Sequence, residues 1–188
     1  MITNVDVREA VQAYLAVHPQ RREELADALV LLERDDDLIL RSSFPAHVTV
    51  GALLLDGDSE VLTVWHRAYD RELQAGGHLE PDDETLISAA LRELAEESGI
   101  DPARVELLRQ EPVYIEYGPV PARPTKGEPA HHHMDIGYSF AVRGPRPATA
   151  AQEEEIDSIF WRSIAGIEKI LPGPRARALA ELAAEFTS

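Results

Sequence analysis

The sequence contains no cysteine. This absence excludes disulfides, thiolate metal sites and a cysteine nucleophile. The chain also lacks an apolar run of 18 residues, and its first ten residues lack the basic and apolar regions of a secretory signal. We therefore expect a soluble, cytoplasmic protein with no membrane partner.

Basic residues are scarce, since 18 Lys and Arg stand against 34 Asp and Glu and give a formal net charge of −16. Broad binding of nucleic acid needs a basic field, so we expect no nucleic-acid partner. An acidic chain is compatible with a site that collects metal cations. The 188 residues, of which 44% are hydrophobic, are sufficient for one core.

The hydrophobic pattern predicts strands that are interrupted by one central helix and closed by another. Two short helices are expected within residues 4–34 and a terminal amphipathic helix at 176–186. The predicted strands are a hairpin at 48–66 and single strands at 113–117, 134–142 and 159–161. Residues 118–130 hold four prolines and two glycines and are predicted to form a long loop. This order indicates a layered α/β or α+β domain with a mixed sheet.

The stretch from Gly76 to Ile100 carries most of the candidate chemistry. A helix is expected to begin near residues 83–85, where short polar side chains suit an N-cap, and to end at Gly99. At about 100° per residue, an apolar stripe and an acidic arc adjoin on this helix. The stripe consists of Ile87, Ala90, Leu91 and Leu94, and the arc of Glu93, Glu96 and Glu97.

The acidic arc favours a metal site over an ordinary surface helix. Like charges at i, i+3 and i+4 destabilise a helix by a few tenths of a kcal/mol per pair, and no lysine is interleaved among them here. Hard oxygen ligands select Mg²⁺, Mn²⁺ or Ca²⁺. Gly76 and Gly77 allow the backbone to approach closely and to lend a carbonyl to a metal. The alternative is an acidic helix whose charges cluster by chance.

This segment resembles the Nudix box, whose pattern is Gly-x5-Glu-x7-Arg-Glu-U-x-Glu-Glu-x-Gly-U, where U is aliphatic. The second half matches at every position, namely Arg92, Glu93, Leu94, Glu96, Glu97, Gly99 and Ile100. The first half contains one extra residue, as in similar bacterial Nudix proteins with a GGHxE loop. Asp83 therefore has the family's spacing from Gly77, whereas Glu84 has the family's spacing to Arg92, and either acid could orient that arginine.

The resemblance covers roughly residues 44–162 and implies the Nudix fold, an α/β/α sandwich with a central mixed sheet. We expect residues 1–40 to form an N-terminal helical extension and residues 41–188 to form the Nudix hydrolase domain. The N-terminal helices, with the terminal helix, could either pack on the sheet or form the interface of a homodimer.

The resemblance also implies hydrolysis of a pyrophosphate bond in a nucleoside diphosphate linked to another moiety, a small-molecule substrate. Glu93, Glu96 and Glu97, with the Gly77 carbonyl, would hold Mg²⁺ or Mn²⁺, which polarises a phosphate oxygen and lowers the pKa of the attacking water. Glu93 is the family's usual candidate for metal ligand and base. Arg92 would orient a glutamate through a charge-assisted bond.

Further site residues are implied outside the box. Glu153, Glu154 and Glu155 precede a strand and are candidates for an accessory base, with a solvated acidic turn as the alternative. For substrate contact or an additional metal, the candidates are His78, His131 and His133, which could instead be structural. Tyr117 is a candidate for stacking on a base, and Arg123 and Lys126 for a second phosphate. Asp135 is expected to orient a histidine, and His47 to be structural.

Two other functions of the Nudix fold are alternatives to hydrolysis. A non-catalytic Nudix-fold sensor would bind a nucleotide without cutting it, but such domains usually lose the paired glutamates or the arginine, which are intact here. The isopentenyl diphosphate isomerase branch relies on a cysteine, which this chain lacks.

Overall fold

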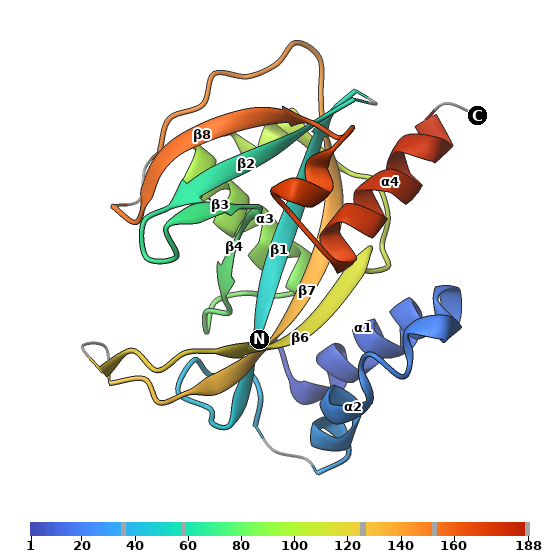
Figure 1. The fold of residues 1–188 in the computed structure, drawn as a ribbon, viewed down its shortest axis with the longest axis vertical. Coiled ribbons are helices and arrows are strands. Elements are labelled where there is room, and N and C mark those ends of the chain that lie inside the picture. Colours follow the sequence, from blue (N-terminus) through green and yellow to red (C-terminus); the bar gives the residue numbers. More distant parts are fainter. Residues whose placement is uncertain (35–36, 58, 125–126, 152–153, 187–188) are drawn as a thin grey trace.

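The computed structural model describes residues 1–34, 37–57, 59–124, 127–151 and 154–186. Figure 1 shows a twisted sheet with helices on both sides. The helices are α1 (Asn4–Val17), α2 (Ala26–Glu33), α3 (Leu86–Ser98) and α4 (Pro174–Phe186), with short 3₁₀ turns at Pro19–Arg21, Pro102–Arg104 and Ile167–Lys169. The strands are β1 (Ala46–Asp56), β2 (Glu60–His66), β3 (Arg71–Leu73), β4 (Ala75–His78), β5 (Val105–Leu107), β6 (Tyr114–Val120), β7 (His131–Val142) and β8 (Ile156–Ser163).

The described strands form one mixed sheet around a parallel pair, β1 and β7. The order β3-β2-β1-β7-β5 makes its main path, and β4, β6 and β8 pair with β1, β7 and β2. Every pairing except that of β1 with β7 is antiparallel. The predicted mixed sheet is confirmed.

Two apolar cores lie on opposite faces of the sheet, because successive side chains of a strand point to opposite sides. On β1, Val50 and Leu54 belong to the core that includes α3, whereas Leu53 and Leu55 belong to the core that includes α4. Figure 1 shows α3 behind β1 and α4 on the near side. The expected α/β/α sandwich is therefore present.

The N-terminal helices share the core that lies on the α3 side of the sheet. Val7 and Val11 of α1 and Leu31 of α2 are buried in it, and Arg8 donates to the carbonyl oxygen of Leu32 at 2.9 Å, which joins the two helices. The division into an extension (1–40) and a hydrolase domain (41–188) stays a proposal. None of the helices in the described ranges is both long and apolar enough to cross a membrane.

The buried face of α3 differs from the predicted apolar stripe. Ala90 and Leu94 are buried as expected, but Ile87 and Leu91 are only half-buried. Glu93 and Glu97 are 7% and 2% exposed. The helix packs on β4, whose two glycines have no side chains. Glu93 and Glu97 can therefore lie against this strand and are buried.

The predicted loop at 118–130 was wrong at its beginning. Residues 118–120 belong to β6 and pair with His131 to His133 of β7. In the described part of the chain, β6 pairs with β7 alone and is therefore an edge strand. Proline has no N–H to donate to a neighbouring strand, and an edge strand tolerates it because one of its sides has no partner strand.

Candidate functional site

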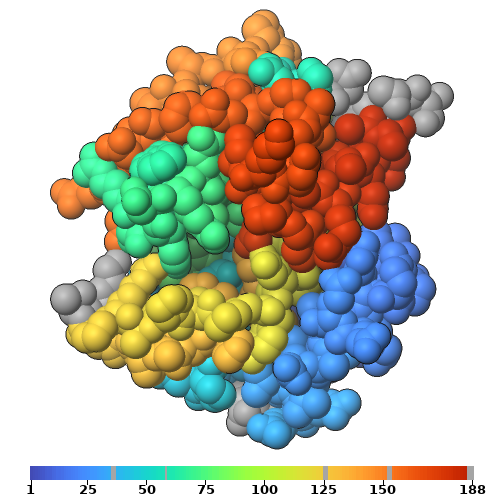
Figure 2. Space-filling view, in the orientation of Figure 1, coloured from blue at the N-terminus to red at the C-terminus, as the bar shows by residue number. Residues whose placement is uncertain are grey.

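A cavity of about 900 Å³ opens between β4, α3 and the end of β6. Figure 2 shows the surface hollowed between the green atoms that follow β2 and the yellow atoms after β6. Acidic lining comes from Glu80, Glu93, Glu96, Glu97, Glu116, Asp135, Glu154 and Glu155, and basic lining from Arg41, Arg71, Arg92, Arg123 and Arg175. The cavity therefore holds acidic and basic groups side by side in a chain that is acidic overall.

Helix α3 begins and ends where the sequence predicted. Thr85 is the N-cap: its Oγ1 accepts from the N–H of Ser88 at 3.0 Å, and the Ser88 Oγ accepts from the N–H of Thr85 at 2.9 Å. Gly99 ends the helix at φ +70°, a left-handed conformation that favours glycine. The glutamates are thus carried by a helix fixed at both ends.

Glu93 and Glu97 lie against the glycines of β4. The Oε2 of Glu97 accepts a hydrogen bond from the N–H of Gly76 at 3.0 Å. A Cβ added to Gly77 would lie 2.6–2.7 Å from the carboxylate of Glu93. This carboxylate therefore occupies the space that a side chain at residue 77 would fill, as the expected close approach requires.

Arg92 connects the acidic residues. Its Nε and Nη2 donate to the two carboxylate oxygens of Asp83, each at 3.0 Å. Its Nη1 donates to Glu93 at 2.9 Å and to Glu96 at 2.8 Å. Nη2 also donates to the carbonyl oxygen of His78 at 2.9 Å. Because every nitrogen of the guanidinium is occupied, Arg92 positions other residues.

The structure resolves which acid pairs with Arg92. Asp83 is buried and also accepts the N–H of Glu80 at 2.8 Å, whereas Glu84 is exposed. Burial alone would raise the pKa of Asp83, but the bonds from Arg92 and Glu80 hold this pKa below its ordinary value. The loop accommodates its extra residue in a turn at 80–83, closed by the N–H of Asp83 on the carbonyl oxygen of Glu80, and Asp83 contacts Arg92 of α3.

The acidic face fits a hard divalent cation. Three carboxylates, those of Asp83, Glu93 and Glu96, accept from one guanidinium, and the buried carboxylate of Glu97 lines the same cavity, so negative charge remains at a partly buried place. Carboxylate and carbonyl oxygens are the ligands that Mg²⁺ and Mn²⁺ prefer. Gly77, Glu93, Glu96 and Glu97 all line the same cavity.

We expect Gly77→Ala to separate activity from folding. The new Cβ displaces the carboxylate of Glu93, the end of a flexible side chain, and a displacement of about 1 Å at a reactive group can cost on the order of 100-fold in kcat. Gly76→Ala is the contrasting variant, because its Cβ would meet the backbone oxygen of Val50 at 2.3 Å. Thermal unfolding and kcat of both should show Gly77→Ala folded but slow and Gly76→Ala destabilised. An active Gly77→Ala protein would contradict this geometry.

The histidines of β7 are placed on both faces of the sheet. His131 and His133 share one face, with their Nε2 atoms 3.1 Å apart. His132 points the other way and stacks on Tyr117 with ring centroids 4.9 Å apart. His78 and His133 line the cavity, but Tyr117 is not among its lining residues in the described chain. The geometry thus brings together His78, His131 and His133 and separates Tyr117 from them.

The prediction that Asp135 orients a histidine was wrong. Asp135 accepts from Thr49 at 3.2 Å, Gln74 at 3.1 Å, Tyr114 at 2.9 Å and Arg175 at 2.7 Å, and none of these donors is a histidine. Burial and the charge of Asp135 raise the pKa of Tyr114, so its hydroxyl stays a donor. The sequence pattern missed Arg175, which enters the cavity from the beginning of α4.

The candidate accessory bases lie only partly within the described residues. Glu153 lies outside the described residues, as does Lys126. Glu154 and Glu155 line the cavity, and an oxygen of Glu155 is 3.6 Å from Nε2 of His66. Arg123 also lines the cavity, with its guanidinium 4.5 Å from the ring centroid of Tyr69.

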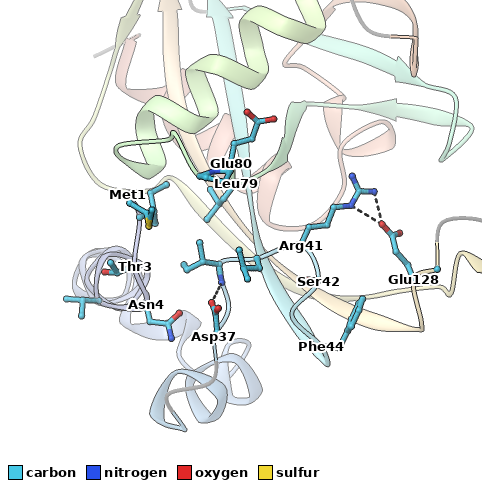
Figure 3. A pocket seen from close by; sticks show the side chains of 16 residues that line it. Met1, Thr3, Asn4, Asp37, Arg41, Ser42, Phe44, Leu79, Glu80 and Glu128 are labelled. Atoms are coloured by element: carbon cyan, nitrogen blue, oxygen red, sulfur yellow. Dashed lines mark hydrogen bonds and ion pairs between the residues drawn. The ribbon is translucent and has the colours of Figure 1, made fainter.

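A second cavity, of about 860 Å³, lies beside the first and is mostly apolar. It is formed by the beginning of α1, residues 37–44 and residues 79–81, as Figure 3 shows. Arg41, Leu79 and Glu80 line both cavities. Arg41 is held by Glu128 at 2.7 Å, an ion pair that Figure 3 shows at the edge of this second cavity.

Comparison with known proteins gives the family. A family model described as the NUDIX domain matches residues 45–186, and the chain therefore belongs to the NUDIX family. An RNA pyrophosphohydrolase of Dinoroseobacter shibae (strain DSM 16493 / NCIMB 14021 / DFL 12) is 40% identical over 80 residues, which are 40% of this chain and 48% of that protein. The match thus spans about half the length of this curated relative.

Solved structures show the same fold at low identity. An Ap4A hydrolase of C. elegans is 15% identical, with a TM-score of 0.59 over 74% of this chain and 97% of that chain. A dihydroneopterin triphosphate pyrophosphohydrolase of E. coli is 15% identical, with a TM-score of 0.53 over 73% of this chain and 95% of that chain. A NUDIX family hydrolase of Clostridium perfringens is 19% identical, with a TM-score of 0.52 over 75% and 96%. These similarities establish a shared fold.

Proposed function

We propose that this protein is a metal-dependent pyrophosphohydrolase that cuts within the diphosphate of a nucleoside diphosphate linked to another moiety. One observation carries the proposal: the buried carboxylates of Glu93 and Glu97 lie on the glycines of β4, and Arg92 fixes the rest of the acidic face. Family membership and the names of the relatives support the same class of reaction.

We propose Glu93, Glu96 and Glu97, with the Gly77 carbonyl, as the groups that would hold Mg²⁺ or Mn²⁺. A bound ion supplies Lewis acidity and lowers the pKa of a water molecule. Glu93 and Glu97 bring negative charge to a place largely closed to water, where electrostatic interactions are stronger. Arg92 keeps these carboxylates in place through bonds to Glu93 and Glu96.

The opposite part of the lining suits phosphate. Arg41 and Arg123 line the cavity and are the basic groups that we propose for the second phosphate. His78 and His133 are neutral, because burial above all lowers the pKa of His78 to about 2 and of His133 to about 3. They therefore bring no charge to this part of the lining. Glu154 and Glu155 line the same cavity and stay the candidates for an accessory base.

Turnover of a panel of compounds tests this proposal. The panel holds ADP-ribose, a nucleotide sugar, a dinucleoside polyphosphate, a nucleoside triphosphate and, because of the curated relative, an RNA with a 5′-triphosphate. Each is incubated with Mg²⁺, with Mn²⁺ and with EDTA, and released phosphate and nucleotide are measured. We expect metal-dependent cleavage of one small-molecule class and little cleavage of RNA, since the net charge of −16 repels a polyanion.

The same panel separates the enzyme from a nucleotide sensor. A protein that binds one of these compounds, as measured by calorimetry, but cleaves none of them would favour the non-catalytic interpretation. The cytoplasmic location and the homodimer stay predictions from the sequence.

A further inference from the structure

The rings of His47, His78, His131 and His133 meet on one side of the sheet. His78 and His133 line the same cavity as Glu93, Glu96 and Glu97. The parallel pairing of β1 with β7 places His47 opposite His133, and the pairing of β1 with β4 places His78 opposite Thr49. The ring of His47 is at the centre, with centroids 4.7 Å from His133, 4.8 Å from His131 and 5.1 Å from His78. These rings come from three strands, so the cluster exists only in the folded protein.

The backbone fixes the proton on two of these rings. Nδ1 of His47 lies 3.2 Å from the carbonyl oxygen of Ser43, and Nδ1 of His131 lies 2.7 Å from that of Pro129. A carbonyl oxygen only accepts, so each Nδ1 carries the hydrogen and each Nε2 keeps a lone pair. The lone pair of His131 lies toward Nε2 of His133, at 3.1 Å.

His47 is 1% exposed, and its buried Nε2 has no hydrogen-bond partner among the residues that the structure describes. An unpaired buried acceptor destabilises the folded protein, so such an atom calls for an explanation. Histidines that ligate a metal through one ring nitrogen usually donate the N–H of the other to a carbonyl or carboxylate oxygen, as His47 does through Nδ1.

We propose that His47, His78 and His133 form a binding site for a transition-metal ion of the Zn²⁺ or Co²⁺ type, separate from the glutamate site. One ring nitrogen from each of the three lies within 4.8 Å of the others. Nitrogens bound tetrahedrally to zinc at about 2.0–2.1 Å are about 3.3–3.4 Å apart, so a pair separated by 4.8 Å has to close by about 1.4 Å. His131 lies beside this site as a positioning residue for His133.

The chemistry of the cluster favours a cation of this class over an anion. The free lone pair of His47 repels a phosphate oxygen but binds a cation. Imidazole nitrogen suits zinc, cobalt, nickel and copper, whereas Mg²⁺ requires oxygen ligands. The nearby charge of Arg41 is balanced by Glu128. The two metal sites would therefore take different ions.

The histidine site and the glutamate site meet at one residue. The ring of His78 belongs to the histidine cluster, while its carbonyl oxygen accepts from Arg92 at 2.9 Å. A metal at the histidines would fix β4 beside the glutamate face, and it would stabilise the folded protein by mass action.

Cobalt titration tests the site without any need for turnover. The protein is freed of metal with EDTA, and Co²⁺ is added while the visible d–d absorption is recorded, because nitrogen ligands in a low-coordinate site give much stronger bands than carboxylate and water. We expect one equivalent of Co²⁺ with strong bands, displacement of these bands by Zn²⁺, and a rise in Tm with either ion.

Three variants decide which residues are responsible. His133→Gln should weaken Co²⁺ binding by on the order of 100-fold. Loss of a residue that only supports a ligand costs about 10–100-fold, so loss of a ligand should cost at least as much. His132→Gln is the matched control, because its ring lies on the other face of the same strand and should leave the bands intact. Glu97→Gln removes a glutamate ligand and should also leave them intact. If His133→Gln fails to fold by circular dichroism, His78→Gln takes its place.

The proposal is overturned by any of three results: no saturable d–d bands in the wild-type protein, bands that persist in the histidine variant, or bands that disappear in Glu97→Gln. None of these results bears on the hydrolase proposal, which is decided by turnover with Mg²⁺ or Mn²⁺.

Discussion

Replacement of Glu97 by glutamine is expected to lower kcat by on the order of 10²–10³-fold while Tm stays close to that of the wild type. Glu97 is 2% exposed, and its Oε2 accepts the N–H of Gly76. The glutamine side chain keeps an oxygen for this bond but loses the charge that a cation needs. Loss of one electrostatic group at a reacting centre typically costs this much. Measurement of kcat at saturating Mg²⁺, together with thermal unfolding, checks the prediction.

Glu84→Gln is the matched control for this variant. Glu84 lies in the same loop-helix segment but is exposed, and Arg92 is bound by Asp83 instead. We expect its kcat to stay within about twofold of the wild type, as for most surface substitutions. Full activity in Glu97→Gln, or an equal loss in Glu84→Gln, would refute the assignment of the glutamate face.

Arg92→Lys should lose both stability and activity, although the charge is kept. Lysine has one compact ammonium group and cannot hold Asp83 through two parallel bonds while also reaching Glu93, Glu96 and the His78 carbonyl. Each lost hydrogen bond to a charged group costs about 1.5–3 kcal/mol, and the lower value applies because the Arg92 side chain is 21% exposed, so two lost bonds cost about 3 kcal/mol. A loss of about 3 kcal/mol lowers Tm by roughly 6–12 °C in a domain of this size.

A double-mutant cycle shows whether Arg92 acts through Asp83. Asp83→Asn alone and combined with Arg92→Lys should give a coupling free energy of about 1–3 kcal/mol, as for residues in direct contact. The same cycle with Glu84→Gln should give no coupling. An Arg92→Lys protein with unchanged Tm and kcat would contradict the role of the guanidinium as the centre of the acidic face.

Features set by local sequence were predicted well. The N-cap near residue 85, the end of α3 at Gly99 and the hairpin of β1 and β2 depend on neighbours in the chain. The family could be predicted because Arg92, the glutamates and Gly99 match the spacing of the Nudix box. The bonds of Arg92 to Glu93 and Glu96 place these three side chains on one side of α3.

Features set by contacts between distant segments were not predicted. Periodicity placed the apolar stripe of α3 inside, but two glycines of β4 allowed Glu93 and Glu97 to be buried instead. Asp135 bonds with Arg175, 40 residues further along the chain, and no local pattern indicates that partner. His47 looked structural because its place beside His133 depends on the register of β1 against β7.

The measurement that tests the central claim most directly is ³¹P NMR of the compound panel with the wild-type protein, first with Mg²⁺ and then with excess EDTA. The account predicts that the diphosphate signals of one compound class are replaced by signals of phosphate monoesters or of released phosphate, and that EDTA stops this conversion. Diphosphate signals that persist in every compound, or a conversion that EDTA leaves unchanged, would contradict a metal-dependent pyrophosphohydrolase built on Glu93, Glu96 and Glu97.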